Sequence, residues 1–248
     1  MFDLHMHTTY SDGMNPPEEM IEEGIRRGMS SIGLSDHSHA DWDEAGMPAS
    51  VIEAYRQEIA RLKQTYTGRI RVLCGLERDY FSDDFRPYDY VIGSVHAVRM
   101  QDGDFFCVDW NPAEMEEKVR SYFNGDWYAL TEAYFGLEAD VVDRTKCDII
   151  GHFDLVSKFN EQYRWFDPSH PRYRSAWQQA ADRLLRTGKA FEVNTGAISR
   201  GYRSDAYPAR EIRDYLRERG GKLILSSDAH QRENICFRFE QFLKELSS

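Results

Sequence analysis

Hydrophobic residues along the chain fall into seven short runs, each rich in Ile, Val, Leu or Phe and bounded by turn residues. A short continuous apolar run of this kind is typical of a strand that is buried on both faces in a parallel sheet. The runs predict strands at Phe2–His5, Ser31–Leu34, Arg71–Leu76, Tyr90–Ser94, Asp148–Gly151, Ala190–Val193 and Lys222–Leu225.

Helical spacing of apolar residues fills most of the intervals between these runs. The first helix is predicted to begin at Asn15, before Pro16-Pro17. A long helical stretch is predicted from Asn111-Pro112 to about Thr145, with a break near Asn124-Gly125. The other predicted helices are Ser50–Gly68, Arg172–Arg186, Pro208–Arg219 and Glu233–Leu246. The segment Phe81–Tyr88 is too short for a full helix. The Asp102-Gly103 pair predicts a hairpin within Val98–Asp109.

Strands that alternate with helices predict parallel strands with the helices packed outside them. No linker-like change in composition divides the chain, so one α/β domain over residues 1–248 is expected. An open doubly wound sheet is the alternative to a barrel. Two observations favour the barrel. No glycine-rich dinucleotide fingerprint follows the first strand. Polar residues follow most of the strands, and a barrel brings the carboxyl ends of all its strands together at one mouth.

Composition narrows the classes of protein. Hydrophobic residues make up 41% of the 248 residues, which is enough for a large core. The 31 basic and 42 acidic residues give a net charge of −11, which disfavours nucleic-acid binding but not a small anionic substrate. The four cysteines are scattered, and neither a signal peptide nor a membrane span is recognisable, so reduced thiols and a cytoplasmic location are expected.

Potential metal ligands stand at or just after every predicted strand. Six of the eight histidines are among them; in chain order the polar residues are His5, His7, Asp12, Asp36, His37, Glu77, His96, His152, Asn194, Asp228 and His230. Residues i and i+2 of a strand point to the same face, so both members of His5-x-His7 can face one ion, and Asp228-x-His230 repeats this spacing. A carboxylate after a buried strand, such as Glu77, must be paired, hydrogen-bonded or bound to a metal.

So many imidazoles and carboxylates at one mouth predict a site for more than one metal ion. Nitrogen and oxygen ligands suit Zn, Mn or Fe, and a bridging carboxylate lets neighbouring ions share ligands. Other polar residues have less specific interpretations. His39 is expected to line a loop, His170 to lie in a surface turn, and Asp154 either to orient His152 or to cap a helix.

The ordered set of motifs resembles the polymerase and histidinol phosphatase (PHP) superfamily. The matching segments are His5-Met6-His7 with Ser11-Asp12-Gly13, Ser35-Asp36-His37, Gly75-Leu76-Glu77, Gly93-Ser94-Val95-His96, Gly151-His152-Phe153-Asp154 and Ser227-Asp228-Ala229-His230. The family fold is a distorted (β/α)7 TIM-like barrel. Asp89–His96 and Glu192-Val193-Asn194-Thr195 are most similar to the stand-alone histidinol-phosphate phosphatases of the family.

The resemblance implies two or three divalent metal ions. His5, His7, Glu77 and Asp228 would hold one ion; Glu77, His96 and His152 would hold a second; and His37 and His230 would hold a third. Asp12 stands where several relatives have a histidine at the third site. Glu77, Asp228 and His230 are the expected catalytic residues.

The same resemblance implies hydrolysis of L-histidinol phosphate, a step of histidine biosynthesis, by a hydroxide that bridges two metals and attacks phosphorus. Arg200 and Lys158 are expected to bind the phosphate, because arginine and lysine pair well with it. Arg203 is a third candidate for which a surface role is favoured. The oligomeric state is not readable from the sequence.

Other functions remain alternatives. The substrate could be another small phosphomonoester, a nucleotide or a phosphotyrosyl protein, since loops read the leaving group. An exonuclease is disfavoured by the charge, and an amidohydrolase-type barrel by the placement of Glu77 on the third strand. A barrel without activity is disfavoured by the intact set of ligands.

Overall fold

The computed structural model describes residues 1–246, and seven of its strands form one sheet. The strands are β1 (Phe2–Asp3), β2 (Ser31–Leu34), β3 (Arg71–Asp79), β4 (Tyr90–Ser94), β7 (Ile149–Ile150), β8 (Ala190–Asn194) and β9 (Lys222–Ser226). They pair in chain order, β1-β2-β3-β4-β7-β8-β9, and every pairing is parallel. All seven predicted strands are present, although β1 ends two residues before its predicted end at His5, and β3 extends past its predicted end and carries Glu77 within the strand.

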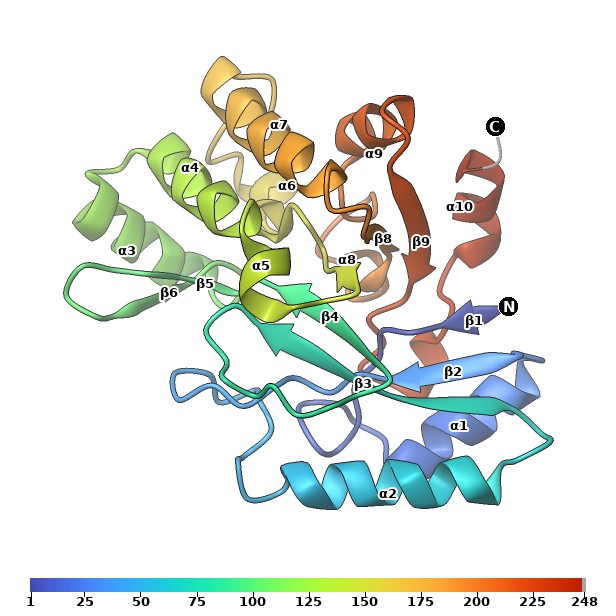
Figure 1. Ribbon diagram of the computed structural model, residues 1–248. Helices are drawn as coiled ribbons and strands as arrows, with labels where there is room; N and C mark the ends of the chain where they lie inside the picture. The colour runs from blue at the N-terminus through green and yellow to red at the C-terminus, as the bar shows by residue number, and fades with distance from the viewer. Residues whose placement is uncertain (247–248) are drawn as a thin grey trace.

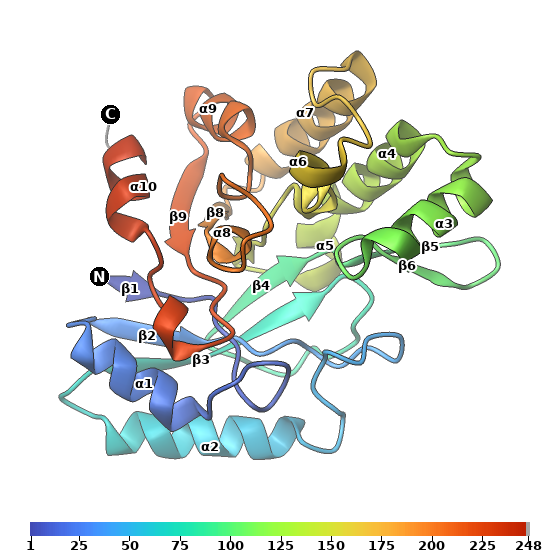
Figure 2. The ribbon, with the colours of Figure 1, turned by 180° about the vertical axis from the view of Figure 1, so that it is seen from behind.

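The first and last strands meet just beyond their ends. Met6 forms a parallel bridge with Ala229, and the backbone N–H of His7 donates to the Ala229 carbonyl over 2.9 Å. This contact nearly closes the strands into a barrel (Figures 1 and 2). A doubly wound sheet reverses its strand order at a switch point. The strand order here is sequential, so the predicted distorted barrel is confirmed and the open-sheet alternative is wrong.

Helices cover the outside of the barrel. They are α1 (Pro17–Arg26), α2 (Ile52–Thr65), α3 (Pro112–Phe123), α4 (Trp127–Glu138), α5 (Val141–Thr145), α6 (Asn160–Tyr163), α7 (Pro171–Leu185), α8 (Gly196–Ser199), α9 (Arg210–Glu218) and α10 (Phe239–Leu246), with 3₁₀ turns η1 (Leu155–Ser157) and η2 (Arg232–Asn234). Figures 1 and 2 show α1 and α2 beside β2 and β3, and α3, α4 and α7 on the opposite side of the molecule. No helix of residues 1–246 has the length and apolar character needed to cross a bilayer.

Local sequence explains where several of these helices begin and end. The Asn111 side chain accepts hydrogen bonds from the N–H groups of Ala113 and Glu114, which caps α3. The predicted break is present, since Asn124 at the end of α3 is left-handed with φ 51°. A hairpin of β5 (Ala97–Arg99) and β6 (Phe105–Cys107) is also present as predicted.

Two predicted helix starts are wrong. The C-terminal helix begins at Phe239 and not at Glu233, because Cys236 and Arg238 have φ values of 55° and 54° that interrupt it. Asn15 does not cap α1; its amide donates to Glu19 Oε2 over 2.8 Å, and its Oδ1 accepts from the N–H of Arg232.

Apolar packing fixes the strands from outside. One hydrophobic cluster joins α1 and α2 to β2 and β3 and includes Ile59 and Leu76, both wholly buried. A second joins α4 and α7 to β4, β7 and β8 and includes Trp177 and Phe191. Dense packing of this kind leaves the strands little freedom, so the residues at their carboxyl ends are held in place. All four cysteines are free thiols, as expected.

Candidate metal centre

The strand ends place the predicted ligands around a single carboxylate, that of Glu77. Its side chain is wholly buried, and Ser94 Oγ donates to its Oε1 over 2.7 Å. Five imidazole nitrogens surround it at 2.8 to 3.5 Å: His37 Nδ1 at 2.9 Å, His5 Nε2 at 3.2 Å and His7 Nε2 at 3.5 Å from Oε2, and His152 Nε2 at 2.8 Å and His96 Nε2 at 3.3 Å from Oε1. Each carboxylate oxygen thus faces its own group of histidines.

Alternation along the chain after β1 directs two histidines to this carboxylate. His5 and His7 point to the same side, while Met6 between them is buried in the hydrophobic cluster beside α1. Both histidines also face Asp228, whose Oδ1 lies 3.2 Å from His7 Nε2 and 3.9 Å from His5 Nε2. The expected same-face geometry of His5-x-His7 is therefore present.

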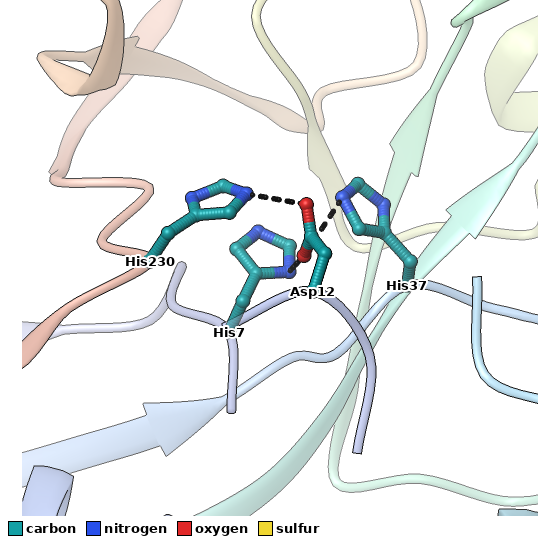
Figure 3. Close-up of side chains that lie close together, drawn as sticks. All are labelled: His7, Asp12, His37 and His230. Atoms are coloured by element: carbon teal, nitrogen blue, oxygen red, sulfur yellow. Dashed lines mark ion pairs between the residues drawn. The ribbon is translucent and has the colours of Figure 1, made fainter. Parts of the chain in front are cut away.

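A second group of ligand atoms surrounds Asp12. His230 Nε2 lies 3.0 Å from Asp12 Oδ2, and His37 Nε2 and His7 Nδ1 each lie 3.8 Å from Oδ1. Figure 3 shows the Asp12 carboxylate with the three imidazoles directed toward it, from the segments that follow β1, β2 and β9. Ligand atoms of these four residues all lie within 4.8 Å of one another.

A left-handed backbone and two closely packed glycines shape the chain around Asp228 and His7. Asp228 has φ 48°, a left-handed conformation that Asp tolerates better than most residues and that is found often at functional sites. A Cβ at Gly196 would lie 2.8 Å from the Asp228 side chain, and one at Gly13 would lie 2.4 Å from the His7 backbone. Only glycine allows these two loops to pack so closely against the ligands.

Burial and mutual charge shift the pKa values of the cluster in opposite directions. Burial alone would raise the pKa of Glu77, but the charges of His37, His5 and His96 hold it well below its ordinary value. Burial also opposes protonation of His37, yet Glu77 and Asp12 raise its pKa to about 9. The pKa of His7 falls to about 3 because it is buried beside His230 and His37. His7 is therefore a neutral imidazole at pH 7, the form that binds metals.

Several buried polar atoms of this cluster find no hydrogen-bond partner among the residues that the structure describes. They are His5 Nε2, His7 Nδ1, His7 Nε2, Glu77 Oε2 and His152 Nδ1. Buried polar atoms without partners destabilise a fold, and such atoms are few in native proteins. Imidazole nitrogen and carboxylate oxygen are ligands of Zn, Mn and Fe. Divalent ions therefore fit this set of residues, and they would satisfy atoms that the protein leaves unpaired.

Two carboxylates behind the cluster hold its histidines, and neither is among the site residues that the sequence predicts. Glu192 Oε2 lies 2.8 Å from His5 Nδ1, and its Oε1 accepts from the backbone N–H of His152 over 2.6 Å. Asp79 Oδ2 lies 3.2 Å from His96 Nδ1. Alternation along the strands is the signal that could have found them, because Glu192 precedes Asn194 by two residues and Asp79 follows Glu77 by two.

The cluster forms the floor of a cavity of about 230 Å³, whose walls include both predicted phosphate-binding residues. Arg200 Nη1 bonds the Asp228 carbonyl at 3.0 Å and approaches His230 Nδ1 at 2.7 Å, and its Nη2 bonds Asp228 Oδ2 at 3.1 Å. Lys158 Nζ donates to the carbonyl and carboxylate of Asp109 at 2.7 and 3.2 Å. Both cations therefore stand beside the floor.

Four other polar residues lie outside this cluster. His39 is half-buried and pairs with Asp41 in the loop after β2. His170 caps α7, since its Nδ1 accepts from the N–H of Arg172. Asp154 does not orient His152; its Oδ2 accepts from Ser157, Arg203 and the Ala209 N–H. The surface role expected for Arg203 is wrong, because this residue is only 8% exposed and lies over the Tyr207 ring.

The fold and the cluster agree with a known family. The family model of the PHP domain matches residues 3–196, more than three quarters of the chain. The chain therefore belongs to the PHP family, and the amidohydrolase-type alternative is excluded.

Several relatives of this chain are named as phosphatases. A probable histidinol-phosphatase of Deinococcus radiodurans is 32% identical over 98% of this chain and 92% of its own length. The histidinol-phosphatase of Bacillus subtilis is 26% identical and covers 98% of both chains. A crystal structure described as that of a putative histidinol phosphatase from Listeria monocytogenes superimposes with a TM-score of 0.85 at 18% identity, over 98% of this chain and 100% of the other.

Proposed function

We propose that this chain is a metal-dependent phosphomonoesterase that hydrolyses L-histidinol phosphate to L-histidinol and phosphate. The observation that supports the chemistry is the group of buried, unpartnered nitrogen and oxygen atoms at the floor of a small cavity. The full-length similarity to histidinol-phosphatases supports the substrate. A structural neighbour from Lactococcus lactis, with a TM-score of 0.72 and 21% identity over 99% of this chain and 92% of that one, is described as a complex with Zn, L-histidinol and phosphate.

Two or three divalent ions would be held by the residues at the floor. His5, His7, Glu77 and Asp228 would hold one ion, Glu77 with His96 and His152 another, and Asp12 with His37 and His230 a third. Bound ions of this type lower the pKa of water and neutralise charge on phosphate oxygens. This set of ligands is compatible with Zn, Mn or Fe, because all the ligand atoms are nitrogen or oxygen.

The chain itself would supply orientation and further positive charge. Glu77 and Asp228, whose pKa values both lie well below the ordinary value, remain anionic and can hold cations in place. Arg200 fixes Asp228 and His230 in position, and its guanidinium is a planar donor suited to a phosphate oxygen pair. Lys158, which pairs with Asp109, is a second cationic side chain in the wall of the same cavity. We therefore assign Glu77, Asp228 and His230 to catalysis, and Arg200 and Lys158 to phosphate binding.

Phosphate release by purified protein of known metal content tests this function. The substrates are L-histidinol phosphate, p-nitrophenyl phosphate, a nucleoside monophosphate and a phosphotyrosyl peptide. A kcat/KM for L-histidinol phosphate at least about 100-fold above the others supports the proposal. Equal and low values with two or three bound metals would leave the phosphoesterase chemistry in place and overturn the substrate. Failure to bind nucleic acid and a cytoplasmic location remain predictions for binding and fractionation experiments.

A further inference from the structure

One wall of the cavity above the metal centre carries carboxylates and aromatic rings that the mechanism does not use. Trp42 and Asp43 come from the loop between β2 and α2, and Asp109 and Trp110 come from the segment between β6 and α3. All four line the same cavity as the metal ligands. This wall is therefore where the alcohol part of a phosphomonoester would lie when its phosphoryl group is at the floor.

The two carboxylates of this wall differ in their partners. Asp109 is neutralised by Lys158, whose Nζ lies 3.2 Å from Oδ2. Asp43 Oδ1 accepts only the backbone N–H of Ala45, at 2.9 Å. No lysine, arginine or histidine of residues 1–246 forms an ion pair with Asp43. The cavity thus presents one half-buried carboxylate that forms no direct ion pair with a cation of these residues, although the nearby imidazoles of His37 and His96 act on it electrostatically.

Two tryptophans line the same cavity as this carboxylate. Trp42 is stacked on Phe105 with ring centroids 5.3 Å apart and an angle of 13° between the planes, so its position is fixed. Trp110 is 70% exposed at the rim. An exposed indole beside a cavity gains favourable burial when a ligand covers it, and indole faces attract cations and flat rings.

L-histidinol phosphate carries the groups that complement this wall. Its alcohol part bears an ammonium on the carbon next to the ester carbon, and an imidazole beyond it. We propose that Asp43 selects substrates whose leaving alcohol carries an ammonium group, which pairs with its carboxylate, while Trp42 and Trp110 enclose the ring. This inference rests on the proposed function, since it explains how that substrate is distinguished from other phosphomonoesters.

The test compares Asp43→Asn with the wild type on a matched pair of substrates. One is L-histidinol phosphate, and the other is 3-(imidazol-4-yl)propyl phosphate, which lacks only the amine. Assays at pH 8 keep the imidazole mostly neutral, since its ordinary pKa is about 6.5. Asn keeps the acceptor for the Ala45 N–H, so the loop is expected to retain its structure. Glu44→Gln, at the exposed neighbouring position, removes the same charge outside the cavity and is the control.

The expected result is a loss confined to the amine-bearing substrate. Loss of a charge-assisted hydrogen bond should lower kcat/KM for L-histidinol phosphate by about 10- to 100-fold. The kcat/KM for the deamino substrate should change by less than about threefold. Metal content and the melting temperature should match the wild type. Glu44→Gln should leave both substrates unchanged.

Other outcomes overturn the inference. Equal losses on both substrates would mean that Asp43 acts on the reaction itself, as a proton donor, or on the metal centre. No loss on either substrate would mean that the ammonium is recognised elsewhere. A wild type that hydrolyses L-histidinol phosphate no better than p-nitrophenyl phosphate would overturn the proposed function. An efficient wild type with an unaffected Asp43→Asn variant would overturn this inference alone.

Discussion

Two clusters of buried charge in this protein have opposite designs. Arg213 of α9 is 1% exposed, and its guanidinium bonds Asp205 Oδ2 at 3.1 Å, Glu245 Oε1 at 2.7 Å and the Pro208 carbonyl at 2.7 Å. Glu77, at the mouth of the barrel, lies within 3.5 Å of five imidazoles but leaves Oε2 without a hydrogen bond.

The difference distinguishes a structural cluster from a functional one. Arg213 exchanges its hydration for several protein acceptors, so it requires no further ligand. The cluster around Glu77 concentrates nitrogen and oxygen ligands that cannot all be satisfied by one another. A cluster with more metal-ligand atoms than hydrogen-bond donors is stabilised when a metal cation binds to it. The predictions below test this contrast.

Glu77→Gln should have the largest effect. It removes the anionic group shared by five histidines while preserving its shape, so metal content should fall and kcat/KM should drop by at least about a thousandfold, or about 4 kcal/mol. Phosphate release and elemental analysis of the same sample measure both. Retention of full metal content and activity would show that Glu77 is not a ligand.

Chelation provides a control for that variant. Removal of metal from the wild type should lower its melting temperature, because ligands at about 100 times their dissociation constant stabilise a fold by about 2.7 kcal/mol. The same chelator should leave the melting temperature of Glu77→Gln nearly unchanged. An equal shift in both proteins would place the stabilising metal elsewhere.

Arg213→Met should show the opposite division between stability and activity. Loss of the guanidinium leaves Asp205 and Glu245 without this donor, which should reduce the free energy of unfolding by about 3 kcal/mol. Urea unfolding measures the loss, and kcat/KM at 20 °C should stay within about twofold of the wild type. A large loss of activity in protein that is still folded would connect this cluster to the active site.

Glu192→Gln should weaken metal binding more than it weakens the fold. Its Oε2 holds His5 Nδ1 at 2.8 Å, and loss of a carboxylate behind a ligating histidine lowers metal affinity by about 10- to 100-fold. Competition against a chromophoric chelator measures the affinity, and kcat at saturating metal should largely recover. Glu240→Gln, at an exposed position, is the matched control. Unchanged affinity would make Glu192 a purely structural residue.

The sequence predicts the ligands of the metal centre better than it predicts their supports. Ligand candidates are recognisable because each stands at or soon after the end of an apolar run, and the structure brings His5, His96 and His152 together from three such runs. Glu192 lies inside a strand, where a buried carboxylate has the same sequence signature as an exposed one. The sequence does not predict the burial of Arg203 for a related reason. An arginine in a loop has the same sequence signature whether it is exposed or, as here, forms a buried ion pair with Asp154.

Glu138 of α4 is a third kind of buried carboxyl group, since no ion pair joins it to a cation among residues 1–246. Its side chain is wholly buried, Tyr134 Oη donates to its Oε1 over 2.8 Å, and Oε2 has no partner. Burial raises the pKa of Glu138 well above its ordinary value, so the neutral form is favoured in the folded state. The stability that this group contributes is complete below the unfolded pKa of about 4.3 and is lost as the pH rises through the folded pKa.

Glu138→Gln should remove this loss of stability at higher pH, because Gln keeps an acceptor for Tyr134 and does not ionise. The variant should gain on the order of 1 kcal/mol over the wild type between pH 5 and pH 8.5, measured as the free energy of urea unfolding. Glu132→Gln on the same helix is the control. Arg172 lowers the pKa of Glu132, so the contribution of Glu132 to stability changes only at acid pH. Parallel profiles for wild type and Glu138→Gln would mean that this carboxylate finds a cation in solution. Divergent profiles would show that a buried carboxylate without a metal or an arginine is kept neutral by a proton.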